Sequence, residues 1–137
     1  MLKKMKNGEL VLSKEEISAL DRRAIDGGIP SLTLMRTAAA AVYRRILSLG
    51  VDLSAPVVVC GSGNNGGDGY ALALLMEEAG IPVAVLESAK PKSHDCAYYA
   101  SRCTCPRVDE AALDGATLIV DAMYGFSFRG SLPASDA

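Results

Sequence analysis

One glycine-rich segment of this 137-residue chain brings together several polar groups that could do chemistry. The segment covers residues 61–69 and reads GSGNNGGDG. Its GxGxxG spacing satisfies the dinucleotide-binding fingerprint, and Glu87 lies roughly where that fingerprint places a ribose-binding acid. Asp68 argues against an ordinary pyrophosphate site. Its negative carboxylate would lie where the N-terminus of a helix would otherwise bind a phosphate. The loop is also expected to continue past Gly66 instead of entering a helix there.

The paired Asn64 and Asn65 supply amide groups without net charge. Such groups suit a hard, weakly held cation, or the amide and hydroxyl edges of a ligand. Asp121 ends an apolar run, and in a parallel sheet the carboxyl ends of the strands form the edge at which ligands bind. Structural roles stay open for all of these residues, because glycine loops are often tight turns and an aspartate often caps a helix.

The elements that must position these residues follow the order strand, loop, helix, strand. The β-branched run VVVC at 57–60 is typical of a strand buried on both faces. A helix is predicted over 70–79, and further strands over 82–86 and 117–121. We expect the three strands to be parallel neighbours, with the glycine loop and Asp121 at one shared edge.

Helices are predicted on either side of this unit. A capping box at Ser13 predicts a helix that ends at Gly27. Ser31 is expected to cap a second helix that Gly50 closes, and Ser93 a short third one through residue 101. A helical turn is expected over 109–113, and residues 122–137 show no clear period. The second helix has one apolar face, formed by Met35, Ala38, Ala39, Val42, Ile46 and Leu49.

Composition limits the class of protein. The chain is 50% hydrophobic and 22% charged, which is typical of a single globular domain. A net charge of −2 argues against nucleic acid as a partner, and no apolar run approaches the ~18 residues of a membrane span. With four cysteines and no signal peptide, we expect reduced thiols and a cytoplasmic location.

Three segments together resemble the YjeF N-terminal domain family, whose enzymes are NAD(P)H-hydrate epimerases. They are LSKEEISALDRRAIDGGIPSLTLM, VVVCGSGNNGGDG and VDAMYGFSFRG, and the match extends from about Val11 to about Gly130. The resemblance implies an α/β fold, a Rossmann-like three-layer α/β/α arrangement with a mainly parallel sheet. It also implies that residues 1–137 are a single domain that is incomplete at its C-terminus. The strand at 117–121 is then expected near an open edge of the sheet.

The resemblance implies an isomerase that interconverts the R and S epimers of hydrated NADH or NADPH in cofactor repair. A potassium ion, one per subunit, is the implied cofactor. The implied partners are a second copy of the chain in a homodimer and an ADP- or ATP-dependent NAD(P)H-hydrate dehydratase, separate or fused. Neither nucleic acid nor a membrane is expected as a partner.

Carried over residue by residue, the resemblance assigns Asn65 and Asp121 to the potassium ion and leaves the catalytic acid or base unassigned. It expects residues 125–131 to be a loop around the phosphate side of the nicotinamide cofactor. There Gly125 and Gly130 allow close backbone approach, and Ser127 and Arg129 offer donors to an anion. The implied cofactor-binding residues are Asn64, Asn65, Gly66, Gly67, Asp68, Gly125, Phe126, Ser127, Phe128, Arg129, Gly130 and Ser131.

Two departures from the family pattern keep other functions open. Arg36 and Ala39 stand where the family usually has Glu and Gly, and the chain stops before an IDIPSG-type motif that supplies a further aspartate. The alternatives are a non-catalytic binding or scaffold domain and an ordinary Rossmann NAD-binding domain. A zinc site is a further alternative, with His94, Cys96, Cys103 and Cys105 as its ligands.

Overall fold

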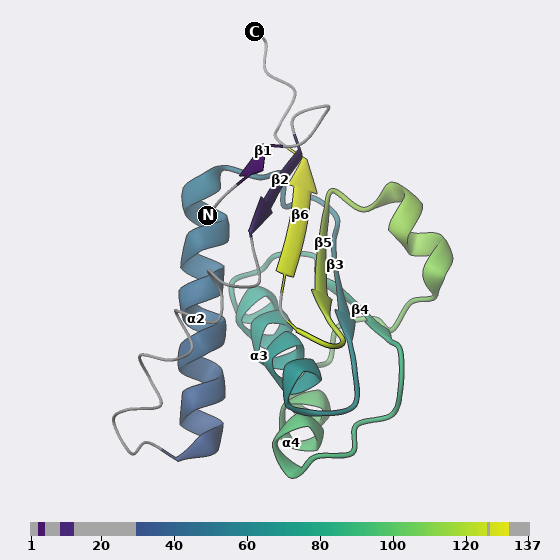
Figure 1. Ribbon diagram of the computed structural model, residues 1–137. Helices are drawn as coiled ribbons and strands as arrows, with labels where there is room; N and C mark the ends of the chain where they lie inside the picture. The colour runs from purple at the N-terminus through teal and green to yellow at the C-terminus, as the bar shows by residue number, and fades with distance from the viewer. Residues whose placement is uncertain (1–2, 5–8, 13–29, 126, 132–137) are drawn as a thin grey trace, which may run out of the picture.

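The computed structural model describes residues 3–4, 9–12, 30–125 and 127–131, and the side chains of 30–125 and 127–130 (Figure 1). The described strands form one six-stranded sheet in the order β1-β2-β6-β5-β3-β4. In that order, β5, β3 and β4 run parallel, whereas β1, β2 and β6 pair antiparallel with their neighbours. The strands are β1 (Lys3–Lys4), β2 (Glu9–Leu12), β3 (Pro56–Cys60), β4 (Ala84–Glu87), β5 (Leu118–Ala122) and β6 (Ser127–Ser131).

The three strands predicted from apolar runs are parallel neighbours, as expected. Val58 in the central strand β3 pairs with Val120 of β5 on one side and with Val85 of β4 on the other. Every residue of β3 is buried, which explains its continuous apolar sequence, since layers of structure cover both of its faces. The prediction for β4 began too early, because the strand starts at Ala84 and not at residue 82.

The expectation of an open edge beside β5 is wrong for the described residues. β6 lies along β5, with Val120 opposite Phe128, and β2 lies along β6, with Leu10 opposite Gly130. The expectation that 125–131 is a loop is therefore wrong for Ser127–Ser131, which form a strand. The segment carries too few residues for a clear alternating pattern, and its partner β2 comes from the other end of the chain.

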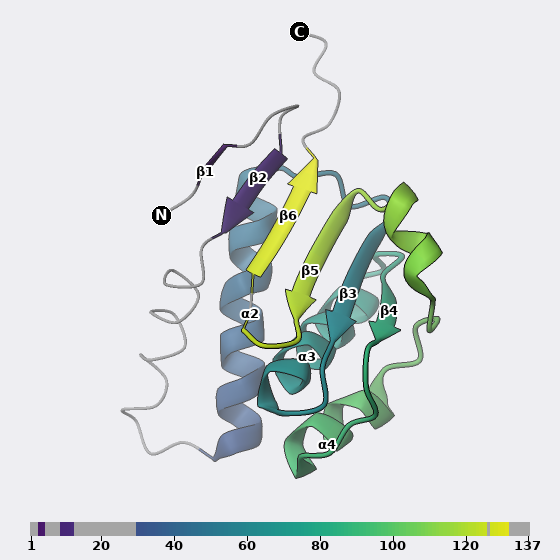
Figure 2. The ribbon, with the colours of Figure 1, turned by 45° about the vertical axis from the view of Figure 1, so that its right-hand side comes forward.

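Three helices cover one face of the sheet: α2 (Ser31–Leu49), α3 (Asn64–Glu78) and α4 (His94–Arg102) (Figure 2). Their buried side chains form one core cluster with Val58, Val85, Val120 and other inward residues of the strands. The short 3₁₀ helix η2 (Glu110–Gly115) packs its Ala112 and Leu113 on the other face, against a smaller cluster. The chain therefore has the three-layer α/β/α, Rossmann-like fold that was expected.

The helix ends follow the sequence signals in most places. The α2 face predicted to be apolar is buried from Met35 to Ile46, and Gly50 ends the helix in the left-handed conformation, at φ 68°. Ser31 is the first helical residue and not the cap, because Pro30 occupies the N-cap position. Ser93 caps α4 as predicted, its hydroxyl accepting a 3.2 Å hydrogen bond from the Cys96 amide. The helix predicted from Ser13 lies outside the described residues.

The start of α3 differs from the prediction. The helix begins at Asn64, six residues before the predicted start at Tyr70, so most of the glycine-rich segment is helical. Glycine is the poorest helix former after proline. Helix propensity therefore does not predict a helix in a segment with this many glycines. Of the helices in the described part of the chain, none is long and apolar enough to cross a membrane.

Candidate functional site

The glycines of α3 are required by close packing. A Cβ on Gly66 would lie 1.9 Å from the carbonyl oxygen of Gly61, and one on Gly67 would lie 2.6 Å from Sδ of Met35. A Cβ on Gly69 would lie 2.8 Å from Cβ of Ala122 in β5. The absence of these side chains lets the first turns of α3 lie directly on the glycine loop, on α2 and on the sheet. Asn64, Asn65 and Asp68 are thereby held at the carboxyl edge of the parallel strands.

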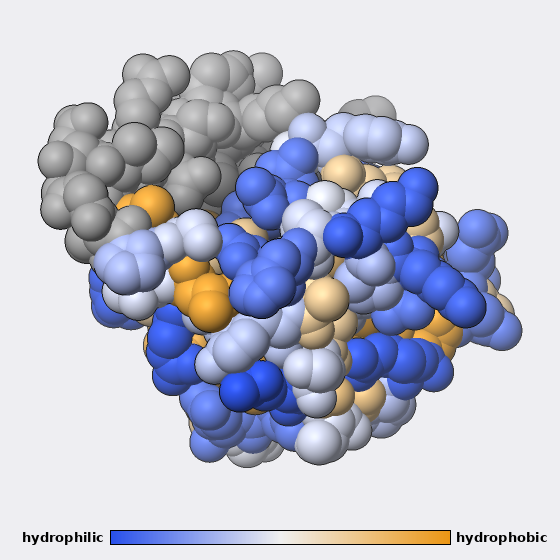
Figure 3. Space-filling view, turned by 90° about the horizontal axis from the view of Figure 1, so that it is seen from below, coloured by the Kyte–Doolittle hydropathy of each residue, from blue (hydrophilic) through white to orange (hydrophobic). Residues whose placement is uncertain are grey.

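A cavity of about 190 Å³ lies where the first turns of three helices meet. The view onto this end of the molecule shows a mainly hydrophilic surface with small hydrophobic groups (Figure 3). Helix N-termini carry partial positive charge, so the convergence attracts acceptor groups, while the carboxylates among the lining residues attract donors. The cavity is lined by Ser31, Leu34 and Met35 of α2, Asn64, Asn65 and Asp68 of α3, and Asp95 of α4.

Asp95 is a site residue that the sequence analysis missed. Its side chain is only 14% exposed, and hydrogen bonding by Ser31, followed by the neighbouring His94, lowers the pKa of its carboxyl group below 3.8. Asp95 is therefore ionised near neutral pH. In the sequence it looks like an ordinary acidic residue in the first turn of a helix, so no signal marks it as part of a site.

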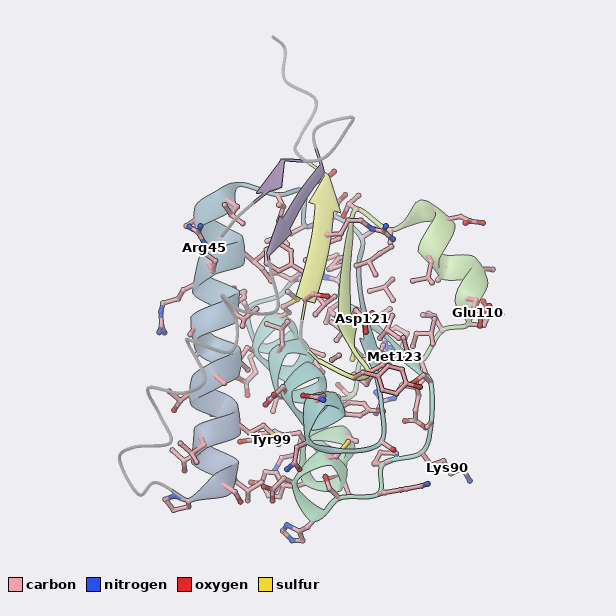
Figure 4. The ribbon with its side chains drawn as sticks, viewed as in Figure 1. Arg45, Lys90, Tyr99, Glu110, Asp121 and Met123 are labelled. Atoms are coloured by element: carbon pink, nitrogen blue, oxygen red, sulfur yellow. The ribbon has the colours of Figure 1, made fainter. Side chains whose placement is uncertain are left out.

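The helices around the cavity are tied together by Tyr99 of α4. Its side chain lies between α4 and α2, and its hydroxyl donates a 2.6 Å hydrogen bond to the carbonyl oxygen of Leu32 (Figure 4). The loop before α4 is also joined to the glycine loop, because the amide of Lys92 donates to the carbonyl oxygen of Ser62 at 2.8 Å. These bonds fix the three first turns relative to one another.

Asp121 lies at the same edge of the sheet as the glycine loop, as predicted. The amide of Gly61 donates to the carbonyl oxygen of Ala122 at 3.1 Å, and a Cβ on Gly61 would lie 2.8 Å from the carbonyl oxygen of Met123. The turns that follow β3 and β5 are thus in direct contact. The carboxylate of Asp121 accepts a 3.1 Å hydrogen bond from the amide of Met123, which holds it beside that contact (Figure 4).

The side chains of the segment 125–131 differ in which face of the sheet they lie on. Ser127 and Arg129 alternate with buried positions and lie on the more open face of the sheet. Phe128 is 2% exposed and belongs to the core beneath the helices. A Cβ on Gly130 would lie 3.1 Å from side-chain carbons of Leu118 and Val51, so this glycine makes room for core packing. Phe126 lies outside the described residues, as does the side chain of Ser131.

Glu87, the candidate ribose-binding acid, is held by structural contacts. Its carboxylate accepts a 2.7 Å hydrogen bond from the hydroxyl of Tyr70 and lies 4.0 Å from Nε of Arg107. Burial, followed by the hydrogen bond to Glu87, raises the pKa of Tyr70, so the hydroxyl keeps its proton and donates it. These contacts give Glu87 a role in joining α3 to β4, and they weaken the case for an ordinary NAD-binding domain.

Comparison with known proteins assigns the family. Residues 31–137 match the family model described as YjeF-related protein N-terminus. The chain belongs to this family. It is 43% identical over 123 residues to an NAD(P)H-hydrate epimerase of Limosilactobacillus reuteri, covering 84% of this chain and 58% of that relative. It is also 36% identical over 131 residues to a bifunctional NAD(P)H-hydrate repair enzyme of Pyrobaculum aerophilum, covering 85% of this chain and 26% of the relative.

The two α2 residues that depart from the YjeF pattern lie outside the cavity. Arg36 lies 3.3 Å from Glu78 of α3 in an exposed ion pair, and Ala39 is fully buried. Neither lines the cavity between the first turns of the helices. In this YjeF-related chain, Arg36 therefore pairs with α3 at the surface and Ala39 lies in the core, and neither changes the lining of the cavity.

The four residues considered for zinc do not come together in the YjeF-related fold. His94 is 85% exposed, and the thiol of Cys96 donates to the carbonyl oxygen of Gly61 at 3.6 Å. Among the described residues, the thiols of Cys103 and Cys105 are instead grouped with the carboxylate of Glu77.

Proposed function

We propose that this chain carries the NAD(P)H-hydrate epimerase activity after which its relatives are named, and that hydrated NADH and NADPH are its substrates. The observation that best supports this proposal is the cavity. Asn64, Asn65 and Asp68 of the family motif line it together with residues from the first turns of α2 and α4. The chain spans 58% of the length of the epimerase from Limosilactobacillus reuteri, and its matched part includes this cavity.

The reaction inverts the carbon beside the ring nitrogen that carries the added hydroxyl group. Inversion breaks the carbon–oxygen bond, or opens the ring, and remakes the bond on the other face. Either route needs a proton donor and acceptor near the hydroxyl group and a stabiliser for the developing ring cation. Asp95 lines the cavity and is suited to stabilise that cation, because its lowered pKa keeps it charged. The carboxylate of Asp68 lines the same cavity and is proposed as the proton acceptor.

The polar groups of the cavity also suit the rest of a nicotinamide. The side-chain amides of Asn64 and Asn65 offer donors and acceptors to the carboxamide and hydroxyl groups of the substrate. Ser127 and Arg129, on the open face of β6, are proposed to contact the phosphate side of the cofactor. Phe128 and Gly130 face the core, so any contact of theirs with the cofactor would come from the backbone.

A potassium ion is proposed as the cofactor, with Asn65 and Asp121 as ligands. The amide and carboxylate oxygens are the donors that hard cations take, and the contact between Gly61 and Met123 brings the two turns together at one edge. When bound, the ion would supply a fixed positive charge beside the substrate. The hydrogen bond from the Met123 amide, which holds the Asp121 carboxylate at this edge of the sheet, supports the proposal.

We further propose a cytoplasmic homodimer that works with an NAD(P)H-hydrate dehydratase. The bifunctional repair enzymes of Pyrobaculum aerophilum and Coxiella burnetii support the pairing of two activities by their names. The four free cysteines suit a reducing compartment. Light scattering coupled to size-exclusion chromatography tests the dimer.

A coupled assay tests the epimerase. The protein is mixed with the R epimer of hydrated NADH and a dehydratase that accepts only the S epimer, and recovery of NADH absorbance is followed. Recovery that depends on the protein supports the proposal, after the slow spontaneous inversion has been subtracted. Failure to accelerate recovery, with folded protein and with potassium present, would contradict it and favour the non-catalytic binding domain.

A further inference from the structure

Two thiols and a carboxylate meet near the C-terminal end of α3. The ligand atoms of Glu77, Cys103 and Cys105 all lie within 4.8 Å of one another. The cysteines are 7% and 8% exposed, whereas Glu77 is half-buried, so the group has one side open to solvent. Asn65 lies twelve residues before Glu77 on α3, or about 18 Å along a helix that rises ~1.5 Å per residue. The group is therefore separate from the cavity described above.

The side chains of this group are held in place by their neighbours. The carboxylate of Glu77 accepts hydrogen bonds from Thr104, from its amide at 3.0 Å and from its hydroxyl. The thiol of Cys103 donates to the carbonyl oxygen of Tyr70 at 3.2 Å. The hydrogen bonds from Thr104 orient the Glu77 carboxylate as a ligand before an ion binds. The hydrogen bond of Cys103 holds its sulfur in place in the metal-free protein, and a metal ion would take the place of the thiol proton.

The charges favour a divalent cation. Two thiolates and a carboxylate would carry three negative charges, of which a divalent ion offsets two. The guanidinium of Arg107 offsets part of the third, because its Nη1 donates to the carbonyl oxygen of Cys105 at 3.1 Å and lies 3.9 Å from its Sγ, while its Nε lies 4.0 Å from Glu87. Burial of charge is costly unless it is paired, so a divalent ion lowers the cost of placing these groups together in a partly buried site.

We propose that Glu77, Cys103 and Cys105 bind a zinc-class divalent ion, with water as the fourth ligand on the open side. Thiolate sulfur and carboxylate oxygen are ligands that such ions take in tetrahedral geometry. Binding forms two metal–sulfur bonds and one metal–oxygen bond and releases the thiol protons to solvent, so no oxidant is needed. The ion would join the segment after α4 to the end of α3.

Cobalt(II) is the probe, because thiolate ligation gives it a charge-transfer absorption band. The protein is kept reduced with a phosphine and titrated with Co²⁺ and then with Zn²⁺. We expect the band to saturate at one ion per chain and to disappear as Zn²⁺ replaces Co²⁺. Cys103→Ser and Cys105→Ser should each weaken metal binding by at least ~100-fold. That is the upper end of the loss of affinity when a residue that only hydrogen-bonds to a ligand is removed, and here a ligand itself is lost.

Two further variants separate a metal site from a general effect on the fold. Glu77→Gln should keep the charge-transfer band, because both thiolates remain, but should bind Co²⁺ more weakly. Cys96→Ser is the matched control, since Cys96 is also a buried thiol that donates to a backbone carbonyl, and it should leave the titration unchanged. Circular dichroism checks that each variant is folded.

The proposal is overturned if the reduced protein shows no thiolate-to-cobalt band. It is also overturned if the band persists in the double variant Cys103→Ser/Cys105→Ser, or if Cys96→Ser abolishes it. Thermal melting gives a second readout, in which Zn²⁺ should raise the melting temperature of the unaltered protein and not that of the double variant. An equal rise in both would place the ion elsewhere.

Discussion

The alpha carbon of Gly66 lies so close to the backbone of Gly61 that a Cβ at residue 66 would be 1.9 Å from the Gly61 carbonyl oxygen. The contact joins the first turn of α3 to the loop after β3. The segment that satisfies the dinucleotide-binding fingerprint is therefore, in this chain, the closely packed start of a helix. It places Asn64, Asn65 and Asp68 in the cavity by excluding every side chain that would separate helix from loop.

Gly66→Ala is expected to destabilise the chain. Alanine is favoured over glycine in a helix by about 1 kcal/mol, but its methyl group would overlap a backbone carbonyl that cannot move away. Overpacking typically costs ~1–3 kcal/mol and sometimes more, so a net loss is expected in urea unfolding. Gly63→Ala is the control, because a Cβ there meets nothing within 4 Å and the φ of −101° suits alanine. Equal midpoints for the two variants would contradict this account of the motif.

Tyr70→Phe should weaken the connection between α3 and β4. The variant removes the 2.7 Å hydrogen bond from the hydroxyl to Glu87 and keeps the buried ring. Hydrogen bonds to charged groups contribute about 1.5–3 kcal/mol, and the lower end is expected, since solvent can reach the freed carboxylate. Chemical denaturation measures the loss. Tyr124→Phe, at a side chain that is 87% exposed, should change stability by less than about 0.5 kcal/mol.

The loss of folding stability at acidic pH should depend on Ser31. The folded-state pKa of Asp95 is below its unfolded value of 3.8, so its contribution to stability is present above that value and is lost as pH falls through the folded pKa. Ser31→Ala removes the largest cause of the lowered pKa, leaving His94 beside it and Asp68 in the same cavity. Carbon-13 NMR titration of the carboxyl group should then give a pKa closer to 3.8. An unchanged value would show that Ser31 does not hold this carboxylate.

Potassium should stabilise the protein through Asp121. If Asn65 and Asp121 are ligands, the ion adds about 2.7 kcal/mol when it is present at ~100 times its dissociation constant. Asp121→Ala should remove this dependence, and the comparison is made between melting curves in potassium and in a large organic cation at equal ionic strength. The same potassium dependence before and after the substitution would rule this site out.

Asp68→Asn should slow the proposed epimerisation. The substitution keeps the size of the side chain and removes the negative charge and the proton acceptor from the cavity. Loss of a general acid or base typically costs about 10²–10⁴-fold in rate, and the coupled assay measures it. Asp114→Asn on the exposed surface of η2 is the control. A rate for Asp68→Asn equal to that of the control would exclude Asp68 from the proton transfer.

The sequence by itself determined the parallel centre of the sheet and the family. The run at β3 is continuous and β-branched because both faces of the strand are buried, so its local pattern carries the information. The apolar face of α2 repeats with the helical period for the same reason. The shared edge of the glycine loop and Asp121 followed from parallel strand direction alone. The motifs around residues 61–69 and 121–130 identified the family.

Only the tertiary structure decided which distant groups meet. β6 is a strand because β5 and a segment near the N-terminus pair with it, and neither partner is visible in its own few residues. α3 begins at Asn64 because packing against Gly61 and Met35 offsets the poor helix propensity of its glycines. Asp95 enters the cavity through the docking of α4 onto α2. Such long-range contacts depend on the whole fold, whereas periodicity and capping act over a few residues. The sequence therefore predicts helices and strands more readily than it predicts which side chains meet in a site.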